Sequence, residues 1–148
     1  MCNQGLIVVY NWNMVRSTPL NGFARARAAH AEETAEDYLE MIEELRAEQG
    51  EARAVDLARA MEVSHTTATK VLARLEREGL VTSRPYRGVV NTAAGRKIAE
   101  EARNRHELVA EFLKRVGVPE AEAEADAEGI EHHVGRATVA AIRRFLAG

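Results

Sequence analysis

At 148 residues, the chain has room for one hydrophobic core or for a small module fused to a second short one, which excludes two large domains. Hydrophobic residues make up 46% and aromatic residues only 5% of the sequence, with three prolines, so we expect a mainly helical soluble protein. The net charge of −3 is unevenly distributed: residues 64–97 carry 7 basic and 2 acidic side chains, whereas acids outnumber bases on both sides. This pattern favours phosphate contact in the middle, and cation binding or plain solvation in the flanks.

The N-terminal segment 1–28 is expected to be a flexible tail, because its first 22 residues show neither helical nor alternating periodicity. The single cysteine, Cys2, cannot form an internal disulfide, and we expect a free thiol rather than a cysteine-based zinc site. The apolar run 6–10 is too short to span a membrane and follows no basic segment. We therefore expect a cytoplasmic protein.

The first predicted helix runs from about Ala28 to Gln49, where Gly50 is a stop signal. Apolar residues at helical spacing form one stripe along it. The stripe consists of Tyr38, Met41, Ile42 and Leu45.

A helix-turn-helix follows. A short helix over 54–61 and a longer one over 65–78 are separated by a three-residue turn. Ser64 is a suitable N-cap for the longer helix, and Gly79 closes it.

Two short strands, 80–83 and 88–91, then flank the basic turn 84–87 and predict a hairpin, or wing. Thr92 caps a long helix that runs to about Val116. Further helices are predicted at about 119–133 and 136–146.

The predicted fold class is therefore mainly α with a small β-hairpin. We expect a winged helix-turn-helix DNA-binding domain over 29–96, after the tail 1–28, and a helical dimerisation and metal-binding domain over 97–148.

The outward face of helix 65–78 has the chemistry of a recognition helix. When its apolar positions Ala68, Val71, Leu72 and Leu75 point inward, short polar residues near the N-terminus and cations farther along point outward. Short side chains allow close approach to base edges, and Lys and Arg contact phosphates or guanine. A basic helix taken alone is most often a solvated face, but here a capped helix and a basic wing occur in order. The predicted DNA-binding residues are Thr66, Thr67, Lys70, Arg74, Arg77, Arg84 and Arg87.

Carboxylates and imidazoles form a second constellation. Two acids are spaced i,i+3 on the first helix, three ligand-type residues are spaced i,i+3,i+4 near the C-terminal end, and one histidine lies between them. Hard oxygen ligands with one or two imidazoles suit Mn²⁺ or Fe²⁺. Spacing alone leaves the ordinary alternative open, since a run of acids on a helix is usually a solvated face. The candidate ligands are Asp37, Glu40, His106, Glu128, Glu131 and His132.

Several segments, in order, resemble the manganese-transport-regulator branch of the diphtheria-toxin-repressor family. They are Glu36-Asp37-Tyr38-Leu39-Glu40, the helix-turn-helix 54–78, the wing turn 84–88, Arg105-His106-Glu107-Leu108 and the rather specific Glu128-Gly129-Ile130-Glu131-His132-His133. The match spans about residues 30–140. The resemblance implies that all six candidates are ligands of a two-ion site with bridging carboxylates.

The iron-sensing branch of that family places Met and Cys where Asp37 and Glu128 stand here, so two hard oxygens favour Mn²⁺, with Fe²⁺ as the alternative. The larger iron-branch members carry an additional SH3-like domain, for which this sequence has no room, so we expect the shorter two-module type.

The resemblance further implies a Mn²⁺-sensing repressor that is not an enzyme. It would bind a palindromic DNA operator as a metal-loaded homodimer and control manganese homeostasis genes, with no membrane or small organic ligand as partner.

Two other classes of protein are alternatives. A winged-helix regulator that answers to an organic ligand would need an apolar pocket and show no metal dependence. A carboxylate-bridged di-metal enzyme would need four long helices, which are not available once 54–91 is a winged helix.

Overall fold

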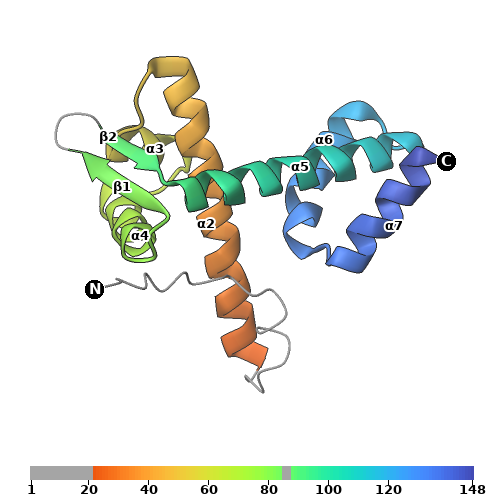
Figure 1. Cartoon of the computed structure of the whole chain (residues 1–148), viewed down its shortest axis with the longest axis horizontal. Coiled ribbons are helices and arrows are strands. Elements are labelled where there is room, and N and C mark those ends of the chain that lie inside the picture. Colours follow the sequence, from red (N-terminus) through yellow and green to blue (C-terminus); the bar gives the residue numbers. More distant parts are fainter. Residues whose placement is uncertain (1–21, 85–87) are drawn as a thin grey trace, which may run out of the picture.

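The computed structural model describes residues 22–84 and 88–148 and confirms the predicted fold class (Figure 1). Within these residues no helix is both long and apolar enough to cross a membrane. The elements in chain order are α2 (Gly22–Gln49), α3 (Ala54–Ala60), α4 (His65–Arg77), β1 (Val81–Arg84), β2 (Gly88–Asn91), α5 (Ala93–Arg115), α6 (Glu120–Ile130), the 3-10 helix η1 (Glu131–His133) and α7 (Arg136–Ala147).

The first helix differs from the prediction at its start, because α2 begins at Gly22 rather than at Ala28. The added turn is rich in Ala and Arg, which have high intrinsic helix propensity, and this outweighs the lack of apolar periodicity. Most of the predicted tail, with Cys2 and the run 6–10, lies outside the described residues.

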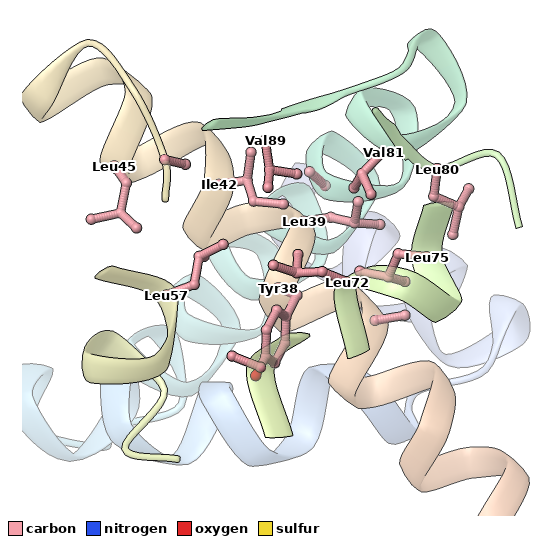
Figure 2. Packing of buried hydrophobic residues seen from close by; sticks show 14 of the residues in the cluster. Tyr38, Leu39, Ile42, Leu45, Leu57, Leu72, Leu75, Leu80, Val81 and Val89 are labelled. Atoms are coloured by element: carbon pink, nitrogen blue, oxygen red, sulfur yellow. The ribbon is translucent and has the colours of Figure 1, made fainter. Parts of the chain in front are cut away.

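One hydrophobic core holds α2, α3, α4 and the hairpin together (Figure 2). The predicted stripe of α2 is buried at Tyr38, Ile42 and Leu45, and Leu39 adds a completely buried side chain to it. On α4, Ala68, Leu72 and Leu75 are buried as predicted, and Val71 packs against the same core. Burial of each large side chain contributes about 1.5–3 kcal/mol to folding.

Both predicted helix caps are present. The Ser64 hydroxyl accepts a hydrogen bond from the Thr67 N–H at 3.1 Å, and the Thr92 hydroxyl accepts one from the Gly95 N–H at 3.2 Å. Such caps satisfy backbone N–H groups that lack a partner within the helix. They fix where α4 and α5 begin.

The wing is fastened to α2 at its base. Strands β1 and β2 pair antiparallel, with Val81 opposite Asn91. The buried Asn91 side chain donates hydrogen bonds of 2.8 Å to the Leu39 carbonyl and to the Glu43 carboxylate on α2. Gly88 is needed at the start of β2, because its φ is +71° and a Cβ there would clash with the Ala52 carbonyl.

Helix α5 joins two packing regions. It crosses α2 at one end and packs against α6 and α7 at the other, where Val109, Ala110, Ala127 and Ile142 form a second core (Figure 1). The predicted domain boundary at residues 96–97 therefore falls inside a continuous helix.

The predicted helix 119–133 is divided. The α-helical part ends at Ile130, and Glu131–His133 tighten into the 3-10 helix η1. The tighter turn changes the direction in which these three side chains project, and it buries Glu131.

Candidate metal centre and nucleic-acid interface

Four elements bring the six predicted ligand side chains together where α2 crosses α5. Two come from α2 of the winged-helix module, one from α5, one from α6 and two from η1. In chain order they are Asp37, Glu40, His106, Glu128, Glu131 and His132.

Ion-pair distances link five of the six side chains into one cluster. His106 Nδ1 lies 2.7 Å from Glu131 Oε2 and 3.4 Å from Glu128 Oε2. His132 Nε2 lies 3.3 Å from Asp37 Oδ1 and 3.7 Å from Glu131 Oε1. Ligand atoms of His106, Glu128 and Glu131 all lie within 4.8 Å of one another, close enough to share one ion. Glu131 faces both histidines, one with each carboxylate oxygen.

Glu40 lines a cleft of about 510 Å³ together with other side chains of the cluster. Burial, followed by the charges of Glu131 and Glu128, raises the pKa of Glu40 to about 7, although Arg103 partly opposes the shift. The cleft is lined by Asp37, Glu40, His106 and Glu128, and also by Glu44, Glu62 and Arg103. Four cluster carboxylates therefore repel one another, which a bound cation would relieve.

The two imidazoles respond to the same excess of negative charge. Hydrogen bonds to Asp37 and Glu36 raise the pKa of His132 to about 10, against the effect of burial. Burial lowers the pKa of His106, but contacts with Glu124 and Glu131 outweigh it and the net shift is upward. Burial raises the pKa of Glu131. Protons thus supply part of the positive charge that the cluster attracts.

The donor set fits a hard divalent ion. It offers four carboxylates and two imidazoles, and the described residues contain no cysteine. Glu131 Oε2 is buried, and among the described residues it accepts no well-aligned hydrogen bond, although His106 Nδ1 is 2.7 Å away. A buried carboxylate oxygen that lacks such a donor, next to an imidazole nitrogen, suits a shared cation.

Two acids that sequence reasoning did not identify contact the histidines from behind, and an arginine pairs with one of these acids. Glu36 Oε2 lies 2.9 Å from His132 Nδ1, and Arg105 lies 2.7 Å from the same oxygen. Glu124 Oε2 lies 3.1 Å from His106 Nε2. Glu36 is one of many acids on α2, so the sequence carries no signal of its burial.

The predicted DNA-binding face is largely open. Five of the seven residues are exposed on α4 and β1: Thr66, Thr67, Lys70, Arg77 and Arg84. Arg87 lies outside the described residues. Arg74 is half-buried instead, and its guanidinium donates a hydrogen bond of 3.0 Å to the Ala31 carbonyl on α2. The Thr67 hydroxyl also contacts the cap residue Ser64 at 2.9 Å.

The first helix of the winged helix-turn-helix shares a cluster of acids and imidazoles with the second helical module. This arrangement is typical of DNA-binding regulators that are controlled by a bound ligand. Comparison with protein families narrows this class. Residues 30–89 match the model of the iron dependent repressor, N-terminal DNA binding domain, and residues 92–148 match that of the iron dependent repressor, metal binding and dimerisation domain. The chain belongs to this family, the diphtheria-toxin-repressor family, as a regulator of its manganese-transport-regulator branch and not an enzyme.

Curated relatives support the same branch. A transcriptional regulator MntR of Escherichia coli is 47% identical over 126 residues, covering 85% of this chain and 81% of the relative. The MntR of Salmonella typhimurium is 44% identical over 126 residues, covering 85% and 80%.

Solved structures share the fold. One described as the manganese regulator SloR superposes with a TM-score of 0.67 at 28% identity, covering 76% of this chain and 53% of that one. A manganese-dependent transcriptional repressor in complex with manganese gives a TM-score of 0.64 at 31% identity, covering 76% and 52%. The chain thus spans about half the length of these solved proteins.

Proposed function

We propose that this protein is a Mn²⁺-sensing transcriptional repressor whose ligands are the six clustered side chains. One observation carries the proposal: carboxylates of the DNA-binding module and carboxylates and imidazoles of the second module meet in one cluster, with Asp37 of α2 3.3 Å from His132 of η1. A cation bound there would connect the two modules. The solved manganese regulators with the same fold support manganese as the ion.

The cluster has two halves, which supports two ions in each subunit. His106 and Glu128 face one oxygen of Glu131, whereas His132 faces the other oxygen and also Asp37. Glu131 would then bridge the two ions. The hard oxygens of Asp37 and Glu128 favour Mn²⁺, and Fe²⁺ remains the nearest competitor because it accepts the same donor types.

DNA binding would depend on this connection. Without an ion, repulsion among the carboxylates lets the modules sample several relative orientations, and the ion selects one of them. In a homodimer, the selected orientation would place two recognition helices about 34–36 Å apart, one turn of DNA. Twofold symmetry then requires a roughly palindromic operator, and the genes controlled would be those of manganese homeostasis. Such a regulator acts in the cytoplasm.

The exposed cations and hydroxyls of α4 and the wing are the groups that would contact DNA. Thr66 and Thr67 would lie against base edges, and Lys70, Arg77, Arg84 and Arg87 against phosphates or guanine. Arg74 is the weakest member of the predicted set, since it contacts α2.

Replacement of one ligand tests the function. Glu128→Ala removes a carboxylate whose side chain is 71% exposed, so the fold should persist. We expect the Mn²⁺-dependent part of DNA affinity, about 5- to 150-fold, to disappear, as measured by fluorescence anisotropy. The operator duplex would be selected from a random pool in saturating Mn²⁺. Glu122→Ala, an exposed acid on the same helix, is the matched control. Unchanged Mn²⁺ dependence in Glu128→Ala would contradict the site.

A further inference from the structure

We propose that Glu36, held by Arg105, is a positioning residue that fixes the orientation and tautomer of His132, so that His132 presents Nε2 to the metal. This inference rests on the proposed function, because it concerns how one donor of the cluster is prepared. Glu36 lies on α2 immediately before Asp37 and is not itself among the six ligands.

The contact is built from three separate elements. Glu36 on α2 is only 6% exposed, and its Oε2 lies 2.9 Å from Nδ1 of His132 on η1. The same oxygen lies 2.7 Å from a terminal guanidinium nitrogen of Arg105 on α5. A buried carboxylate is costly unless it is paired, and Arg105 supplies the pairing cation here.

Hydrogen-bond chemistry then assigns the nitrogens. An ionised carboxylate can only accept hydrogen bonds, so the short contact requires that Nδ1 of His132 carries the proton. The lone pair of the neutral ring is consequently on Nε2, which faces Asp37 at 3.3 Å and Glu131 at 3.7 Å. A carboxylate behind a ligating histidine also makes the ring a better donor.

His106 gives an internal comparison because it is held through its other nitrogen. Its Nε2 contacts Glu124 at 3.1 Å, which leaves Nδ1 facing Glu131 and Glu128. The Glu124 side chain is 46% exposed and also contacts Lys114, whereas that of Glu36 is 8% exposed. Water can replace the exposed acceptor but not the buried one. Loss of Glu36 should therefore affect metal binding more than loss of Glu124.

The first test measures Mn²⁺ affinity of the full-length protein by calorimetry. Glu36→Gln keeps the shape but removes the charge, and we expect affinity to fall about 10- to 100-fold. Glu124→Gln should cost less, and Glu48→Gln, an exposed acid near the end of α2, should leave affinity unchanged. If Glu36 were only a structural link between α2 and α5, Glu36→Gln would lower thermal stability while the folded protein kept wild-type affinity, and the proposal would be overturned.

The second test needs no variant. Long-range ¹H–¹⁵N spectra of the wild-type protein loaded with Zn²⁺, a diamagnetic replacement, show which ring nitrogen carries the proton. We expect Nδ1–H with Nε2 bound to metal for His132, and the reverse for His106. A His132 ring bound through Nδ1 overturns this inference and leaves the proposed function standing. Wild-type protein that binds neither Mn²⁺ nor Zn²⁺ overturns both.

Discussion

Glu131 is the residue on which the cluster depends most. It is 2% exposed, it faces both imidazoles, and its pKa is raised by burial. Burial of an ionised carboxylate has a large desolvation penalty unless a positive charge lies next to it. Protonated His132, with its pKa of about 10, provides part of that charge in the absence of an ion. Metal binding must therefore displace protons.

The first prediction concerns this proton release. Glu40, with a pKa of about 7, and His132, with a pKa of about 10, are partly or fully protonated near neutral pH, and a metal requires both groups deprotonated. Mn²⁺ affinity should therefore fall as pH is lowered from 8 to 6, by about tenfold per pH unit for each proton released. Calorimetry in buffers with different ionisation enthalpies counts the protons. In Glu40→Gln the component near pH 7 should be absent; equal affinity at pH 6 and pH 8 in the wild type would contradict the account.

At the scale of elements, α2 serves two purposes with two faces. Tyr38, Leu39 and Ile42 bury one face in the winged-helix core, while Asp37 and Glu40 project from the other into the metal cluster. Helical geometry allows this division, because residues three and four apart share a face. The position of the ligands is thus fixed by the core packing of the same helix.

Truncation within this core provides the second prediction. Ile42 is fully buried, so Ile42→Ala should lower the free energy of unfolding by about 2–5 kcal/mol. The measurement is urea denaturation at fixed protein concentration, since a dimer gains stability from association. Val55→Ala, at a side chain that is 48% exposed, should change stability by no more than about 0.5 kcal/mol. Similar effects of both substitutions would argue against the described packing.

A substitution on the outer face of α4 is expected to lower DNA affinity without changing metal affinity. Lys70→Ala removes an exposed cation from this face, and DNA affinity should fall about tenfold, the usual effect of removing one charged hydrogen-bond donor. The slope of the logarithm of DNA affinity against the logarithm of salt concentration should also become shallower, by about one for each phosphate that the variant no longer neutralises. Mn²⁺ affinity should stay at the wild-type value. Arg143→Ala, which removes an exposed cation from α7, serves as control; if it weakened DNA binding as much as Lys70→Ala, the interface would be misplaced.

Most elements could be predicted from sequence, since caps such as Ser64 and Thr92 and the spacing of apolar residues are local signals. The start of α2 and the 3-10 turn after Ile130 could not, because the first turns of α2 show no apolar periodicity and tertiary packing decides the second. The spacing of acids and histidines identified the six candidate ligands, but only the family resemblance favoured a metal site over a solvated acidic face. Glu36 was missed, because burial of one acid within an acidic helix depends on where Arg105 and His132 lie in three dimensions.

At the scale of the whole molecule, two hydrophobic cores are joined along α5, which crosses α2 at one end (Figure 1). The carboxylate and imidazole cluster forms where side chains of α2, α5, α6 and η1 meet. A cation in the cluster would attach the DNA-binding module to the second module at a point between the cores. Without a cation, the four carboxylates repel one another, so the attachment depends on a bound ion. The ion would thereby set the orientation in which the recognition helices bind DNA.

The most direct test is a titration of Mn²⁺ into full-length protein and a selected operator duplex, followed by excess chelator. DNA affinity is expected to rise about 5- to 150-fold with Mn²⁺ and to return to its starting value with the chelator. Tight, operator-specific binding that is the same with Mn²⁺ and with chelator would contradict this expectation.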